Sequence, residues 1–263
     1  MTKIQEAKTW LKDADAVIVT AGNRMAINEG LDIFSENFMQ EFPDWAEKTE
    51  ANNIANALDV PSSWQEKWQL WSDLIDRYTV NYQASEQMKQ LKSLLADKPY
   101  FIASSSFAHL FEKAGFDPKK IFNIFGDWTK TQCSSGINHG HTDDLAVVEQ
   151  FKGGSGQVPV CKTCGKELEL HMPMTPHFYP DTDANHDFRW FITNNEDAKL
   201  VVLQLGVDLS SPQLAAPVIE LVGQFPNWRF ISCDLPNGSL PYAMQDRVYT
   251  ESSDPKTLLA KLM

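Results

Sequence analysis

Four cysteines provide the clearest chemistry in this 263-residue sequence. Cys161 and Cys164 are separated by two residues, a spacing at which two thiolates bind one zinc ion, and Cys133 lies upstream. The N-terminal residues have no apolar signal-peptide core, so we expect reduced thiols rather than disulfides. The spacing therefore predicts a metal site, whereas Cys233, at the end of an apolar run, is predicted to be a buried core residue.

The elements that must position such residues alternate between strands and helices. Short apolar runs predict strands over residues 16–20, 100–103, 121–124, 200–203 and 228–231. Amphipathic spacing predicts a helix over residues 4–12 and two successive helices within residues 63–96. In the first of these two, Trp64, Trp68 and Trp71 are expected to pack a helix face rather than to form a binding platform. This order is typical of an α/β, Rossmann-like, doubly wound parallel sheet.

One segment interrupts the alternation. Residues from about 129 to 187 are rich in Gly, Pro, His and Cys and have little apolar periodicity. We therefore expect a Rossmann-like domain formed by residues 1–128 and 185–263, with a small cysteine-bearing module, residues 129–184, inserted into it.

The charge of the chain excludes two classes of partner. The sequence has 35 acidic and 23 basic residues, and its formal net charge of −12 repels nucleic-acid backbones and anionic membranes. No stretch approaches the ~20 apolar residues that a membrane helix needs. We expect a cytoplasmic protein that binds neither nucleic acid nor a membrane.

Four segments, in order along the chain, have the form of known motifs. Residues 20–31 read Thr-Ala-Gly-Asn-Arg-Met-Ala-Ile-Asn-Glu-Gly-Leu, and residues 101–111, which precede Gly126-Asp127, read Phe-Ile-Ala-Ser-Ser-Ser-Phe-Ala-His-Leu-Phe. Residues 161–165 read Cys-Lys-Thr-Cys-Gly, and residues 203–212 read Leu-Gln-Leu-Gly-Val-Asp-Leu-Ser-Ser-Pro. In their order and spacing, these segments resemble the Sir2 (sirtuin) family, and most closely its macrodomain-linked class.

The resemblance implies an NAD site at the carboxyl ends of the strands, where a glycine-rich turn approaches the pyrophosphate. Its cofactor-binding residues would be Thr20, Ala21, Gly22, Arg24, Asp127, Gly206, Ser210 and Ser211. Thr20 and Arg24 replace family glycines. Arg24 could obstruct the phosphate, pair with it as a fork, or be an ordinary solvated arginine. Asp127 could orient ribose or cap a turn, and Asp208, in place of a glycine, would repel a pyrophosphate.

The resemblance also locates the catalytic positions, and there this sequence departs from the family. The carboxamide-binding Asn-x-Asp is replaced by Ser106-Phe-Ala108, and Phe125 stands where the family has histidine or glutamine. Serine is shorter than asparagine, and neither alanine nor phenylalanine can relay a proton. Ser106 and His109 remain as candidate catalytic residues, although a lone histidine is more often structural. The sequence therefore predicts impaired or absent catalysis.

The family's zinc ribbon supplies a Cys-x3-Cys pair and a Cys-x2-Cys pair, and here Ile137 replaces the second cysteine. His139 and His141 follow closely, so a Cys3His zinc site of Cys133, His139, Cys161 and Cys164 is expected, with a metal-free loop as the alternative.

These observations predict a divergent protein of the NAD-dependent ADP-ribosyltransferase and deacylase lineage, in effect a pseudoenzyme. NAD or ADP-ribose would be its ligand and zinc a structural cofactor. The resemblance associates the class with lipoyl-carrier or acylated proteins as partners. The alternatives are a module that binds NAD or ADP-ribose without turnover, and an interaction protein with a vestigial pocket.

Overall fold

The computed structural model describes residues 2–174, 177–207, 212–235 and 240–263. The chain forms two compact units. The first unit consists of residues 1–29, 83–125 and 180–263, and the second of residues 30–82 and 126–179. The second unit thus joins most of the expected cysteine-bearing segment to residues 30–82, an association that no local sequence pattern indicates.

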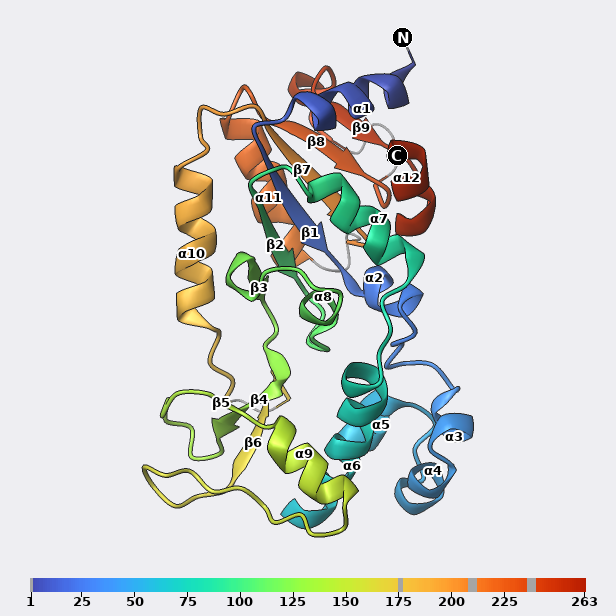
Figure 1. Ribbon diagram of the computed structural model, residues 1–263, viewed down its shortest axis with the longest axis vertical. Coiled ribbons are helices and arrows are strands. Elements are labelled where there is room, and N and C mark those ends of the chain that lie inside the picture. Colours follow the sequence, from blue (N-terminus) through green and yellow to red (C-terminus); the bar gives the residue numbers. More distant parts are fainter. Residues whose placement is uncertain (1, 175–176, 208–211, 236–239) are drawn as a thin grey trace. The chain divides into compact units, whose positions relative to one another are not determined.

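The first unit is built on a six-stranded parallel sheet in the order β3-β2-β1-β7-β8-β9 (Figure 1). This confirms the predicted Rossmann-like α/β fold. The strands are β1 (Ala16–Ala21), β2 (Tyr100–Ser104), β3 (Ile121–Asn123), β7 (Leu200–Leu205), β8 (Arg229–Ser232) and β9 (Val248–Thr250). Five of them coincide with predicted runs. The last, β9, was not predicted, because its three residues are flanked by Arg247 and Glu251 and include only two apolar residues.

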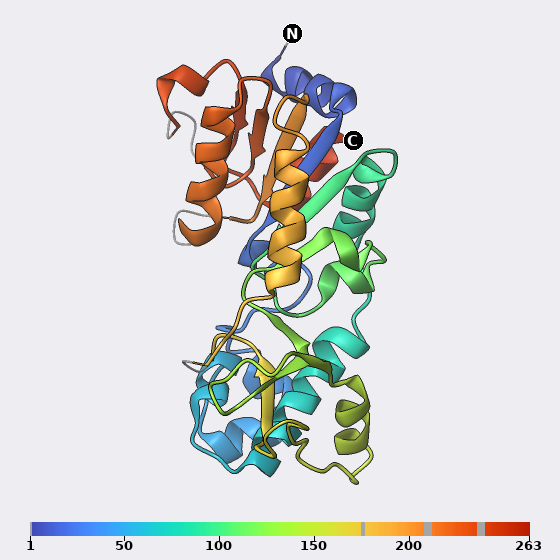
Figure 2. The same cartoon turned by 90° about the vertical axis from the view of Figure 1, so that its left-hand side faces the viewer.

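Helices cover both faces of this sheet. On one face, α10 (Thr182–Thr193) and α11 (Pro212–Gln224) pack on an apolar core that includes Ile18, Val202 and Phe230 (Figure 2). On the other face, α1 (Lys3–Asp13), α7 (Glu86–Leu95) and α12 (Pro255–Leu262) lie together. Two short helices, α2 (Asn23–Asn28) and α8 (Leu110–Lys113), and two 3-10 turns, η2 (Pro118–Lys120) and η3 (Tyr242–Met244), complete the unit. Both strands are buried along their whole length, which explains why β1 and β7 are apolar except at Thr20 and Gln204.

The second unit packs helices against a small antiparallel sheet in the order β5-β4-β6. Its strands are β4 (Asp127–Cys133), β5 (Thr142–Asp143) and β6 (Leu168–His171). Its helices are α3 (Phe38–Glu41), α4 (Pro43–Thr49), α5 (Ile54–Asp59), α6 (Trp64–Ile75), the π-helical turn η1 (Asp76–Val80) and α9 (Leu145–Lys152). The helix α9 was not expected because only Val148 and Phe151 of its eight residues are buried, which leaves little periodicity to detect.

The tryptophan prediction is confirmed for Trp68 and Trp71, whereas Trp64 is only partly buried and its ring lies edge-on to that of Trp71. Trp68 is fully buried and Trp71 is 5% exposed, and the two rings meet edge to face with centroids 5.2 Å apart. The helix begins at a capping box, in which Ser63 accepts from the Glu66 amide and the Glu66 carboxylate accepts from Ser63. In the described part of the chain, no helix is both long and apolar enough to span a membrane.

Candidate functional site

The sheet of the first unit has a switch point between β1 and β7. From β1 the chain goes to β2 on one side, and β7 continues the sheet on the other side. In open α/β sheets, ligands bind outside the carboxyl ends of the strands at this point. The turns that follow β1, β2, β7 and β8 are therefore the candidate nucleotide site, and Ala21, Gly22 and Gly206, which the resemblance assigns to the cofactor, lie at this edge.

The turns after β1 and β7 interlock at two glycines. A Cβ atom on Gly22 would lie 2.0 Å from the carbonyl oxygen of Gly206, and Gly206 itself has a positive φ of 69°. A backbone hydrogen bond also joins the two turns, because the amide of Gly22 donates to the carbonyl of Leu205 at 2.8 Å. Gly22 is therefore required for backbone contact between two strand ends, in addition to any approach of a ligand.

Arg24 is partly exposed and pairs with a carboxylate that follows another strand. Its Nη1 lies 3.2 Å from Oδ1 of Asp234, at the end of β8, and 47% of its side chain is exposed. The side chain of Asp234 is fully buried, and its Oδ2 accepts from the amide of Val207 at 2.9 Å. Burial raises the pKa of Asp234, and the bonds from Cys233 and Val207 and the charge of Arg24 oppose that rise.

The turn after β2 contains the two candidate catalytic residues. Ser106 is 6% exposed, and its hydroxyl accepts from the amide of Ala108, which is itself fully buried. His109 has a left-handed backbone, with φ of 58°, and its Nδ1 lies 3.7 Å from the carboxylate of Glu112 one turn later. His109 therefore has a carboxylate partner close by in the sequence. The hydroxyl of Ser106 contacts the backbone of its own turn.

The other predicted cofactor residues have different positions. Thr20 is fully buried within β1, in register with Gln204 of β7, so it lies in the sheet beneath the candidate site rather than in the turn. Asp127 begins β4 in the second unit, and its Oδ1 accepts from both the amide and the hydroxyl of Thr129. That is the turn-capping geometry considered for it. Ser210 and Ser211, like Asp208, lie outside the described residues.

Three residues at this edge were missed by the sequence reasoning. Asp234 forms an ion pair with Arg24. The other two are Ser105 and Asn23, where the hydroxyl of Ser105 donates to the side-chain oxygen of Asn23 at 3.1 Å. Asn23 and Ser105 lie within the matched segments, but they carry no family function there. A general rule could have identified Asp234, because polar residues directly after buried parallel strands lie at the ligand-binding edge.

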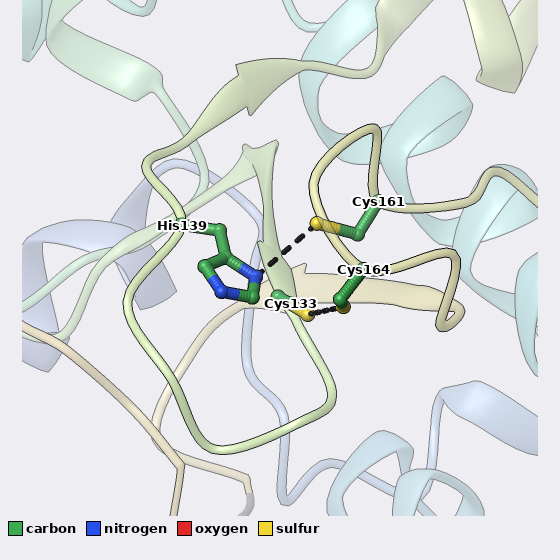
Figure 3. Close-up of side chains that lie close together, drawn as sticks. All are labelled: Cys133, His139, Cys161 and Cys164. Carbon is green, nitrogen blue, oxygen red and sulfur yellow. Dashed lines mark hydrogen bonds between the residues drawn. The ribbon is translucent and has the colours of Figure 1, made fainter.

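The second unit brings together the four predicted metal ligands (Figure 3). The ligand atoms of Cys133, His139, Cys161 and Cys164 all lie within 4.8 Å of one another. The sulfurs of Cys133 and Cys164 are 3.4 Å apart, and Nδ1 of His139 is 3.3 Å from the sulfur of Cys161. Three thiols and an imidazole at this separation fit tetrahedral Zn²⁺, which would hold the loops at residues 133–139 and 161–164 together.

Within the cluster, the pKa values of Cys133 and Cys161 are lowered, whereas those of Cys164 and His139 are raised. Burial raises the pKa of Cys161, but the amides of Cys164 and Thr163 and the ring of His139 outweigh it and lower the pKa to about 6. A thiol that ionises readily is the form that binds metal. The other candidate, His141, instead lies against the ring of His171, with centroids 3.8 Å apart. The structure thus brings His139, rather than His141, to the cysteines.

Comparisons with known proteins agree with the fold and with the sequence resemblance. No family model matches the chain. A protein ADP-ribosyltransferase of Staphylococcus aureus is 25% identical over 96% of this chain and 84% of its own length. A probable bifunctional ADP-ribose hydrolase/ADP-ribosyltransferase of Fusarium oxysporum is 22% identical over 78% of this chain, which spans only 38% of that protein.

Solved structures give the same answer for the fold. A Sir2 homologue mutant in complex with ADP-ribose superposes with a TM-score of 0.62, over 100% of this chain and 95% of the other, at 14% identity. Sir2Tm bound to a propionylated peptide gives 0.62 at 15% identity, over 100% and 98%. A Sir2 homologue in complex with NAD gives 0.61 at 12% identity, over 98% and 91%. The chain therefore has the sirtuin fold that its motifs predict.

Proposed function

Because the chain has the Sir2 fold, we propose that it is a divergent protein of the NAD-dependent ADP-ribosyltransferase and deacylase lineage in which catalysis is impaired or absent. The lineage is supported by its similarity to two relatives named as ADP-ribosyltransferases. The ligands of the solved neighbours, which are ADP-ribose, NAD and a propionylated peptide, support NAD or ADP-ribose as its ligand. A lipoyl-carrier or acylated protein in the cytoplasm is the partner class that we propose.

One observation carries the loss of catalysis. At the turn after β2, where the resemblance requires a carboxamide and a carboxylate, the chain has a serine and an alanine. Ala108 is fully buried and has no polar side-chain atom, and the hydroxyl of Ser106 accepts from the amide of Ala108. Phe125 stands where the resemblance has histidine or glutamine. Its side chain is half-buried and cannot accept a proton.

The reaction needs these missing groups. Expulsion of nicotinamide from NAD leaves an oxocarbenium-like ribose, so a site must hold the carboxamide and accept a proton from a hydroxyl. Loss of a general acid or base costs about 10²- to 10⁴-fold in rate. His109 is the remaining candidate for the base, and the carboxylate of Glu112, 3.7 Å from its Nδ1, is a partner that could orient its ring.

The alternative is a module that binds NAD or ADP-ribose without turnover, or that serves only as an interaction surface. The ion pair between Arg24 and Asp234 favours this class, because it places a charged side chain in the turn where the resemblance has glycine. In either case we propose that the Cys3His cluster binds zinc as a structural ion.

Two measurements test the proposal. Calorimetric titration of NAD and ADP-ribose should show saturable binding, while release of nicotinamide from NAD should be absent or very slow. The variant Ser106→Asn/Ala108→Asp/Phe125→Gln restores the polar groups and should increase nicotinamide release by at least about tenfold. Phe34→Gln, at a phenylalanine that is 67% exposed, is the matched control and should leave the rate unchanged.

Activity of the wild-type protein would contradict the proposal. If it transfers ADP-ribose or removes acyl groups at a rate that Ser106→Ala or His109→Gln abolishes, catalysis is intact and the proposal is wrong. If neither NAD nor ADP-ribose binds, the interaction protein with a vestigial pocket remains.

A further inference from the structure

Three main-chain donors of the β1 turn are already occupied. The amide of Gly22 donates to the carbonyl of Leu205 at 2.8 Å, that of Arg24 to Gly206 at 3.4 Å, and that of Met25 to Gly22 at 3.0 Å. A phosphate at this turn would have to compete with these backbone bonds. Recognition of an anion here therefore falls mainly to side chains.

Arg24 is the charged side chain that the turn presents. A guanidinium has five N–H donors, and the described contacts of Arg24 use one of its nitrogens, Nη1, on Asp234. Because 47% of the side chain is exposed and the ion pair uses Nη1 alone, the guanidinium retains donors for a second partner while the ion pair is kept. A planar fork of this kind matches two oxygens of a phosphate group.

The contacts of Asp234 fix the position of its carboxylate beside Arg24. Its side chain is fully buried, and Oδ2 accepts from the amide of Val207 at 2.9 Å and from the thiol of Cys233 at 3.3 Å. The backbone amide of Asp234 in turn donates to the hydroxyl of Ser232 at 3.2 Å. The carboxylate thus ties together the turns after β1, β7 and β8, and its remaining oxygen points to Arg24.

We propose that Arg24, positioned by Asp234, is the residue that binds the diphosphate of a nucleoside diphosphate ligand in this chain. The inference rests on the proposed NAD or ADP-ribose site and names the group that holds the ligand. It resolves the alternatives that the sequence left open for Arg24 in favour of a phosphate-binding fork. Asp234 is a positioning residue that acts only through Arg24.

The test is calorimetric titration of ADP-ribose, ADP and adenosine into four proteins: wild type, Arg24→Gln, Asp234→Asn and the double variant. Arg24→Gln should weaken the affinity for ADP-ribose and ADP roughly 10- to 100-fold, as expected for a lost charge-assisted hydrogen bond, and leave adenosine binding unchanged. Lower salt should strengthen ADP-ribose binding to the wild type much more than to Arg24→Gln.

The double variant separates positioning from direct contact. Asp234→Asn should weaken ADP-ribose binding when Arg24 is present and have no further effect in the Arg24→Gln background. Arg189→Gln, at an exposed arginine of α10, is the charge-matched control and should bind like the wild type. Thermal melting checks the fold of each variant, and the half-exposed position of Arg24 keeps Arg24→Gln interpretable even if Asp234→Asn unfolds.

Each failure has its own signature. If Arg24→Gln binds ADP-ribose as tightly as the wild type, or more tightly, Arg24 does not hold the diphosphate and only this inference is overturned. If the wild type binds no ADP-ribose at all, the proposed ligand is wrong, and this inference is overturned with it. Equal effects of Asp234→Asn in both backgrounds would show that Asp234 acts independently of Arg24.

Discussion

Gly22→Ala tests the interlocked turns on which the candidate site depends. The new Cβ would lie 2.0 Å from the oxygen of Gly206, 2.6 Å from its carbonyl carbon and 2.8 Å from Cα of Val207. All three are backbone atoms, so no side chain can rotate away, and the turns after β1 and β7 must separate. The separation would also break the 2.8 Å hydrogen bond from the amide of Gly22 to Leu205.

The expected loss of stability follows from these contacts. Overpacking of this kind costs about 1–3 kcal/mol, and the lost hydrogen bond adds about 1 kcal/mol. A total of about 2–4 kcal/mol corresponds to a decrease of about 4–16 °C in the melting temperature of a chain of this size. Thermal melting followed by circular dichroism measures it, and ADP-ribose titration should show weakened binding.

Gly223→Ala is the matched control in the same unit. A Cβ there would have Met244 Sδ as its nearest neighbour, at 3.9 Å, and the residue lies within α11. Alanine in a helix is favoured over glycine by up to ~1 kcal/mol, so this variant should be as stable as the wild type or slightly more stable. If Gly22→Ala melts within about a degree of the wild type, the turns are not interlocked as described and the reasoning is refuted.

Two further predictions concern the second unit. The purified protein should contain one zinc ion per chain by atomic absorption; Cys161→Ser and His139→Ala should lose it, and Cys233→Ala and His141→Ala should keep it, since neither control residue belongs to the cluster. Asp144 is fully buried, and burial together with the charges of Asp127 and Asp143 raises the pKa of its carboxyl to about 9. Because the folded state retains a proton that the unfolded state loses, this group should lower the stability by up to about 1.4 kcal/mol per pH unit as the pH rises from about 4 to 9. Asp144→Asn should therefore flatten the dependence of the urea midpoint on pH, and an unchanged slope would show that the carboxyl ionises freely.

Local patterns predicted the sheet because its strands are buried on both faces. β1 and β7 are apolar at every or nearly every position, so no knowledge of their partners was needed to recognise them. Likewise, the metal cluster could be predicted because thiol chemistry is specific and Cys161-x2-Cys164 is a local spacing. In both cases the information lies within a few residues of the element it describes.

The features that were missed depend on residues far apart in the sequence. Asp234 pairs with Arg24 across 210 positions, and nothing around residue 234 indicates which cation it meets. The joining of residues 30–82 to residues 126–179 is also a long-range packing event. The strand β9 is only three residues long and is flanked by charged residues, and α9 buries only two side chains, so neither produces a detectable period. Contacts of this kind are decided by tertiary packing rather than by local propensity.

The substitutions at the candidate site have different physical consequences for binding and for catalysis. At position 108 a catalytic carboxylate would have to be buried, which is costly without a partner, whereas alanine is fully buried there at no such cost. Active sites commonly sacrifice stability for function, so a chain released from catalysis gains by replacing such groups with apolar ones. Replacement of Gly22, by contrast, would disrupt the contact of β1 with β7, whatever the chemistry of the site. Packing alone therefore explains why Gly22 and Gly206 are present at the turns that could receive a nucleotide, and their presence is not by itself evidence of turnover.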